Sequence, residues 1–278
     1  MAAYSAASRA RSAGSPSASA LDAVLLARCC RPDGSAQQPD DDDCLSERST
    51  ASGSGSPPAE EEEPAAARAA RPAAPMATLF VLDWDDTIMP TTWLTKSGCL
   101  KNTVEATRHW ASLVVASDCI AQTLSKMKKM GRVVIVTNAE EGWVQESAVR
   151  YMPRILPLLW GIEVISARSR YERMAPRAPA MWKRLAFEVV VGKFCKRLLP
   201  GQHANIISVG DMSAERDALF GATEDAPDCW GKSLKFEERP TLSHLVREHQ
   251  LLQGSLEWLV EERGDMDLSC QDRSADPL

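Results

Sequence analysis

The pattern of apolar and polar positions predicts three buried parallel strands. Each is a run of mostly apolar residues without the alternation that a half-exposed strand shows, and each stops abruptly at polar residues. These runs cover residues 78–83, 132–136 and 205–209. Strands of this kind are covered by helices on both faces of a sheet, so the pattern favours an α/β fold.

The segments between these runs predict helices that cross from one strand to the next. Asn102 can cap a helix whose apolar stripe continues to Gly131. Further helices are expected at residues 143–152, 154–159, 183–197 and 240–262, and short strands at 162–166 and 233–236. Right-handed crossovers would then give a three-layer α/β sandwich with a mostly parallel, Rossmann-like sheet over residues 76–264.

Carboxylates gather after the first and third of these strands. Asp83, Asp85 and Asp86 follow the first run within four positions, and Asp211 and Glu215 follow the third. An unpaired carboxylate costs on the order of several kcal/mol to bury, so a cluster at the carboxyl edge of the sheet indicates a bound cation. Asp86 is the exception, because we expect it in a solvated turn.

The motifs at the strand ends resemble those of the haloacid dehalogenase-like (HAD) phosphohydrolase superfamily. The family's motifs are DxDxT after the first strand, Thr or Ser after the second, and GDxxxD/E after the fourth. They are matched by Asp83-Trp84-Asp85-Asp86-Thr87, Thr137 and Gly210-Asp211-Met212-Ser213-Ala214-Glu215. The two segments in which relatives insert a cap domain are short here, with room only for a short flap at residues 87–101 and a loop at residues 167–181. The resemblance therefore implies a capless member, whose open site suits a bulky substrate or a phosphoprotein.

The resemblance also implies a Mg²⁺-dependent phosphomonoester hydrolase that works through an aspartyl-phosphate. Asp83 would be the nucleophile, and Asp85 the general acid and base. Mg²⁺ would be held by Asp83, the backbone carbonyl of Asp85 and Asp211, with Glu215 bound directly or through water. Trp84, between the two key acids, is expected to point the opposite way into the core.

Donors to the phosphate are expected after the second strand and at the start of a later helix. By resemblance, the Thr137 hydroxyl and the Asn138 amide would bind phosphate oxygens. Lys183 is assigned the cationic role of holding nucleophile and phosphate together. The alternatives for this role are Arg168, Arg170 and Lys193.

Two other functions stay open from the sequence. A noncatalytic phosphate- or partner-binding module could keep the same fold, although binding alone has no need for Asp85. A nucleotide or sugar-phosphate phosphatase is the other alternative, so the phosphorylated substrate is either a small molecule or a protein. The oligomeric state is not predicted.

Composition separates the ends of the chain from its middle. Of 278 residues, the first 75 contain no Trp, Phe or Ile and are dominated by small, polar and acidic residues, so we expect a disordered tail there. Its first twenty residues, with Arg9 and Arg11 and no acid, resemble a transit peptide, the alternative being an unstructured extension. Residues 265–278 are expected to form a flexible tail.

Charge and cysteine usage limit the remaining classes. A net charge of -6 argues against nonspecific nucleic-acid binding. No apolar run approaches the ~20 residues that cross a bilayer. The eight cysteines lack paired metal spacing and predict reduced thiols. We therefore expect a soluble intracellular protein without membrane partners, cytoplasmic or alternatively in a plastid or mitochondrion.

Overall fold

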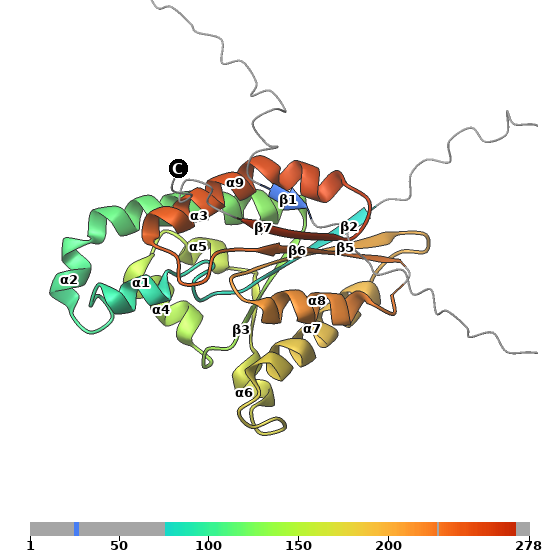
Figure 1. Ribbon diagram of the computed structural model, residues 1–278, viewed down its shortest axis with the longest axis horizontal. Helices are drawn as coiled ribbons and strands as arrows, with labels where there is room; N and C mark the ends of the chain where they lie inside the picture. The colour runs from blue at the N-terminus through green and yellow to red at the C-terminus, as the bar shows by residue number, and fades with distance from the viewer. Residues whose placement is uncertain (1–24, 28–75, 227, 271–278) are drawn as a thin grey trace, which may run out of the picture. The chain divides into compact units, whose positions relative to one another are not determined.

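The computed structural model describes residues 25–27, 76–226 and 228–270 (Figure 1). These residues form a seven-stranded sheet in the order β1-β7-β6-β5-β2-β3-β4. The strands β2 to β7 are parallel, and β1 pairs antiparallel with β7. Their bounds are β1 Leu25–Ala27, β2 Met76–Leu82, β3 Arg132–Thr137, β4 Glu163–Ser166, β5 His203–Gly210, β6 Cys229–Lys235 and β7 Met266–Cys270.

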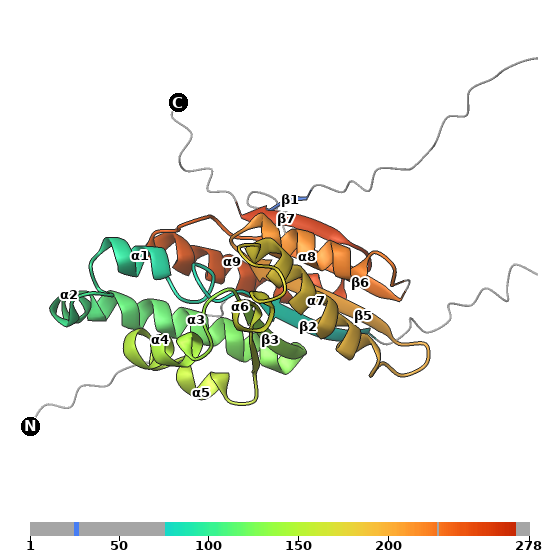
Figure 2. The ribbon, with the colours of Figure 1, turned by 90° about the horizontal axis from the view of Figure 1, so that it is seen from below.

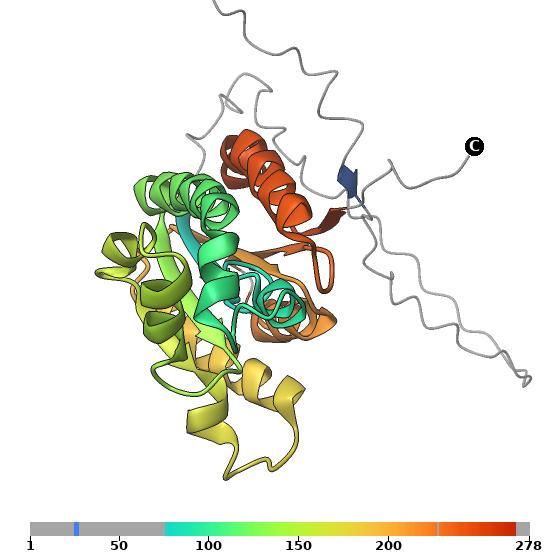
Figure 3. The ribbon, with the colours of Figure 1, turned by 90° about the vertical axis from the view of Figure 1, so that its left-hand side faces the viewer.

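Helices cover both faces of this sheet. α3 and α9 lie over one face, and α7 and α8 lie over the other (Figures 1 and 3). The bounds are α1 Thr91–Lys96, α2 Thr103–Arg108, α3 Trp110–Met130, α4 Trp143–Tyr151, α5 Leu156–Leu159, α6 Ala167–Tyr171, α7 Pro179–Cys195, α8 Ser213–Thr223 and α9 Leu242–Glu261. The predicted three-layer α/β sandwich with a Rossmann-like sheet is confirmed.

Alternate residues of the central strand β2 supply two separate cores. Phe80 and Leu82 pack into the cluster beneath α3 and α9, whereas Leu79 and Val81 pack into the cluster beneath α7 and α8. All four side chains are buried. A strand with a core on each face needs apolar residues at successive positions, which explains the unbroken run in the sequence.

Several elements differ from the sequence-based expectations. The helix expected after Asn102 is divided at His109 into α2 and α3. Residues 167–181, expected to be a loop, contain the short helix α6. Strand β7 lies in the segment assigned to a flexible tail at 265–278, and β1 lies in the segment assigned to a disordered tail at 1–75. The rest of the N-terminal segment, including the transit-peptide region, and residues 271–278 lie outside the described residues.

Both terminal strands were too short to predict. β7 has five residues, of which Leu268 is the buried apolar one, and β1 has three. Their place at one edge of the sheet comes from pairing with a neighbour rather than from a local pattern. Within the described residues, no helix has both the length and the apolar character to cross a membrane.

A close backbone approach before β3 gives a stability test. A Cβ at Gly131 would lie 2.5 Å from the carbonyl oxygen of Thr78 on β2. We expect Gly131→Ala to lower the free energy of unfolding by about 1–3 kcal/mol in urea titrations, because the two strands must move apart. The control is Gly254→Ala on the exposed face of α9, where a Cβ meets nothing within 4 Å. It should stabilise by about 0.5–1 kcal/mol, and an equal effect of both changes would contradict this packing.

Candidate active site

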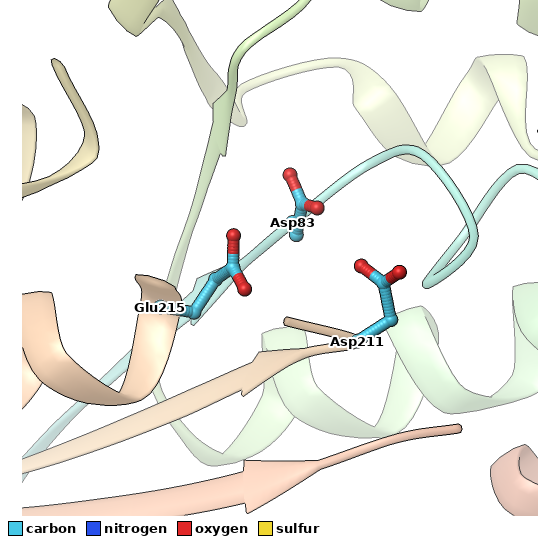
Figure 4. Close-up of side chains that lie close together, drawn as sticks. All are labelled: Asp83, Asp211 and Glu215. Carbon is cyan, nitrogen blue, oxygen red and sulfur yellow. The ribbon is translucent and has the colours of Figure 1, made fainter. Parts of the chain in front are cut away.

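The carboxyl edge of the sheet brings three carboxylates together. Asp83 follows β2, Asp211 follows the neighbouring strand β5, and Glu215 lies in the first turn of α8. One carboxylate oxygen from each lies within 4.8 Å of the others, and all three side chains are buried. Their carboxyl groups are directed toward a shared space (Figure 4). The structure therefore unites three of the residues that the sequence predicted as metal ligands.

Glycine at position 210 makes room for Glu215. A Cβ on Gly210 would lie 2.5 Å from Cγ of Glu215, so no larger residue fits there without displacing the carboxylate. The backbone N–H of Met212 donates to Oε2 of Glu215 at 3.1 Å, which fixes the side chain over the start of α8. The glycine that precedes Asp211 is thus required in this fold for a steric reason.

Lys183 lies at the centre of the acidic group. Its side chain is only 1% exposed, although it comes from the second turn of α7. Nζ donates to Oδ1 of Asp83 at 2.5 Å, to Oε1 of Glu215 at 2.7 Å and to the carbonyl oxygen of Val136 at 2.9 Å. Burial alone would lower the pKa of this amine, but the two carboxylates raise it above its ordinary value. Lys183 is therefore a permanently charged member of the site.

The alternative cations lie elsewhere. Arg168 pairs with Glu140 at 3.4 Å and with Glu172 at 3.3 Å on the surface. Arg170 and Lys193 are exposed. Among the basic residues considered from the sequence, Lys183 is the one that the structure places against Asp83.

One lysine does not balance three acids. Burial raises the pKa of Asp83 to about 7 even though Lys183 opposes the rise. Burial, together with the charges of Asp83 and Glu215, raises the pKa of Asp211 to about 8. With all three carboxylates ionised, the group carries two uncompensated negative charges, and a divalent cation would neutralise them. The oxygen-only ligand set is the kind that Mg²⁺ prefers, so the residues fit the predicted metal.

The carboxylate of Asp85 lies outside this group. It accepts hydrogen bonds from Thr91 Oγ1 at 2.6 Å, Trp143 Nε1 at 2.9 Å and Thr137 Oγ1 at 3.3 Å. Its side chain is therefore not among the clustered carboxylates, which leaves the backbone carbonyl as the ligand atom expected from this residue. Three donors from three elements hold the Asp85 side chain in one orientation.

Sequence reasoning missed two of these donors. Trp143 was expected as the first residue of a helix, and Thr91 as part of a short flap. Trp143 is 58 residues from Asp85, and no spacing rule connects them. The sequence signal for the contact with Asp85 is a Trp at the start of the helix that follows Thr137. From that position an indole N–H can reach the end of the neighbouring strand.

The residues beside the two key acids shape the turn. Trp84 is fully buried and donates through Nε1 to Ser147 Oγ at 3.0 Å, which confirms that it points into the core. Asp86 lies in a turn as expected, with φ 55, but it is buried and not solvated. Its carboxylate accepts from Thr92 N at 2.8 Å and Thr92 Oγ1 at 2.5 Å, and these bonds compensate its burial.

The Asn138 amide, which was expected to bind phosphate, has a partner within the protein. Its Nδ2 donates to the carbonyl oxygen of Pro179 at 3.2 Å, and its buried Oδ1 has no hydrogen bond within the described residues. The bond joins the end of β3 to the start of α7, the helix that carries Lys183. Thr137 also accepts from Ala139 N at 3.0 Å, so its hydroxyl is oriented from both sides.

A polar cavity opens beside Thr137. It has a volume of about 150 Å³ and lies between the loop before α4 and the helix α6. Glu140, Gln145, Ser169 and Arg170 are among its lining residues. The clustered acids and Lys183 do not line this cavity, so Thr137 is the residue that it shares with the site.

His249 anchors the motif loop from behind. Its Nε2 lies 2.8 Å from the carbonyl oxygen of Thr87, and its Nδ1 lies 3.0 Å from Thr123 Oγ1. These partners fix a neutral ring in which Nε2–H donates to Thr87 and Nδ1 accepts from Thr123. Burial lowers the pKa of this histidine to about 4.

Comparisons of the chain with known protein families, with curated proteins and with solved structures found no match. A fold of this class hosts many unrelated activities, so the fold alone does not assign one. The chemistry must be argued from the residues at the carboxyl edge.

Cation binding gives a test that does not depend on turnover. Without metal, we expect Asp211→Asn to melt at a higher temperature than the wild type at pH 8, because it removes a buried like charge. Added Mg²⁺ should raise the melting temperature of the wild type, equivalent to about 2.7 kcal/mol at 100 times its Kd, and should raise that of Asp211→Asn much less. The matched control, Asp217→Asn on the exposed face of α8, should respond like the wild type. Equal Mg²⁺ responses in all three proteins would contradict the assigned ligand.

Acid titration tests the role of His249. Its folded-state pKa, about 4, lies below the ordinary value of 6.5, so the unfolded state binds more protons between these values. The contribution of neutral His249 to the free energy of unfolding is fully present above pH 6.5. It is lost as the pH falls toward 4, by up to about 3 kcal/mol. His249→Gln should lose less stability than the wild type over this interval, as measured by urea unfolding at each pH. Parallel curves for the two proteins would show that the ring is not buried in its neutral form.

Proposed function

We propose that the protein is a Mg²⁺-dependent phosphomonoester hydrolase of the HAD-like kind, with Asp83 as its nucleophile. The observation that carries the proposal is the position of Asp83, which is held by Lys183 at the carboxyl edge of the sheet. A second acid, Asp85, lies two residues away on a separate hydrogen-bond network. Two carboxylates in different environments can perform different steps of one reaction.

In the first step, a carboxylate oxygen of Asp83 attacks the phosphorus of the substrate. The bond from phosphorus to the leaving alkoxide breaks, and Asp85 donates the proton that the alkoxide takes up. Lys183 favours the ionised form of Asp83 and directs its carboxylate, because its ammonium lies 2.5 Å from Oδ1. A bound Mg²⁺ supplies positive charge that lets two anions approach each other.

In the second step, water hydrolyses the aspartyl-phosphate. Asp85 takes a proton from the water, whose oxygen attacks phosphorus, and the bond to Asp83 breaks to release inorganic phosphate. Within the described residues, Oδ2 of Asp85 accepts one hydrogen bond, from Thr137 at 3.3 Å, whereas Oδ1 accepts two, from Thr91 and Trp143. Oδ2 therefore has room to take the proton without displacing a donor.

The space around the site supports a hydrolase with an open entrance. The two segments in which a cap domain would be inserted hold only α1 with its flanking turns and α6. A site without a domain over it admits water, which favours hydrolysis over transfer of the phosphoryl group to a second substrate site. It also admits a bulky phosphomonoester, such as a phosphoprotein, as well as a nucleotide or sugar phosphate.

One observation favours a second function, a noncatalytic phosphate-binding module. Asp85 is held by three donors and Asn138 by Pro179, so both side chains are engaged without a substrate. In such a module, Lys183 and Thr137 would bind phosphate and no ester would be cleaved. The measurement of turnover separates the two functions.

Hydrolysis of p-nitrophenyl phosphate with and without Mg²⁺ tests the proposal. We expect Mg²⁺-dependent turnover by the wild type, a loss of at least about 10³-fold in Asp83→Asn, and a loss of about 10²–10⁴-fold in Asp85→Asn. Asp217→Asn is again the matched control and should keep full activity. If the wild type is no more active than Asp83→Asn on this ester and on a panel of phosphopeptides, nucleotides and sugar phosphates, the hydrolase is contradicted and the binding module is favoured.

A further inference from the structure

Two cysteine thiols lie in contact at the opposite edge of the sheet. Sγ of Cys195, the last residue of α7, lies 3.3 Å from Sγ of Cys229, the first residue of β6. The two residues are 34 positions apart, and no local sequence pattern pairs them. Figure 2 shows α7 and α8 side by side over β5 and β6. The contact joins α7 to β6.

The two thiols differ in accessibility. Cys229 is buried at 5% exposure, whereas Cys195 is half-buried at the end of its helix. A disulfide requires the sulfur atoms to approach to about 2.05 Å, so each side chain must move by only a fraction of an ångström from the present contact. A helix end is the part of a helix that yields most easily.

We propose that Cys195 and Cys229 form a thiol–disulfide site whose oxidant is a low-molecular-weight disulfide. The Cys195 thiolate attacks one sulfur of the small disulfide, whose S–S bond breaks and releases one thiolate. Cys229 then loses its proton to solvent and attacks Sγ of Cys195, which releases the second small thiolate. The protein loses two electrons and two protons, and the small disulfide is reduced to two thiols.

The surroundings of the two thiols determine which one attacks the small disulfide and which one then attacks Cys195. The hydrogen bond from Cys229 lowers the pKa of the Cys195 thiol to about 7, and the same contact raises that of Cys229. Cys195 is therefore both the more ionised thiol and the more accessible one, as an attacking thiol must be. Cys229, which is buried against it, can reach only Cys195.

The site is remote from the acids, so the inference does not depend on the proposed function. Cys229 pairs in register with Ala204 near the start of β5, whereas Asp211 follows the end of that strand. An eight-residue strand spans roughly 25 Å, so the bond forms far from the acidic group. It would close a loop that contains β5 and α8, and thereby restrict the unfolded chain.

The experiment uses the full-length protein, reduced and then incubated with oxidised glutathione. We expect a proteolytic fragment in which Cys195 and Cys229 are linked, detected by mass spectrometry after alkylation of free thiols. We also expect a rise of about 5–10 °C in melting temperature that dithiothreitol reverses. Cys229→Ser should instead accumulate a glutathione adduct on Cys195 and lose the rise, because the second thiol is missing.

Cys119→Ser is the matched control, since Cys119 is buried on α3 away from this pair. It should keep both the linked fragment and the rise in melting temperature. A wild type that carries glutathione on Cys195 without the link would overturn the proposal, as would a link that leaves the melting temperature unchanged.

Discussion

The arrangement of the site depends on one buried ammonium among three carboxylates. Taking Lys183 out of water is unfavourable unless it is paired, and Asp83 and Glu215 pair with it directly at 2.5 and 2.7 Å. Among the described residues Asp211 forms no ion pair, and burial and like charges raise its pKa to about 8. When all three carboxylates are ionised, the group carries two uncompensated negative charges, which a bound cation or added protons would neutralise.

The rest of the fold serves to hold this group in place. The parallel pairing of β2 with β5 puts Asp83 and Asp211 at the same edge of the sheet. Asn138 joins the end of β3 to α7, the helix that delivers Lys183. His249 reaches from α9 to the carbonyl of Thr87 and fixes the loop that continues from the key acids. The first of these contacts lies within the sheet and the other two join it to helices on its two faces, so the position of the acids depends on all three layers.

Local patterns in the sequence were sufficient to predict the strands β2 to β6 of the sheet and the acidic cluster. The apolar runs before Asp83 and Asp211 follow from burial of the strands on both faces of the sheet. The acids at the ends of these runs follow from the edge of the sheet at which ligands bind. What the sequence could not give are contacts set by tertiary packing. The partners of Asp85 and the contact between Cys195 and Cys229 connect residues far apart in the chain. The burial of Asp86 depends on Thr92, whose position is fixed only once α1 has formed.

The most direct test is anomalous diffraction from crystals of the protein soaked in Mn²⁺, which substitutes for Mg²⁺ at oxygen sites. The account predicts an anomalous peak between the carboxylates of Asp83 and Asp211, with Lys183 still paired to Asp83. A fully ordered site at pH 8 with no peak in this space, or with Mn²⁺ bound only elsewhere, would contradict it.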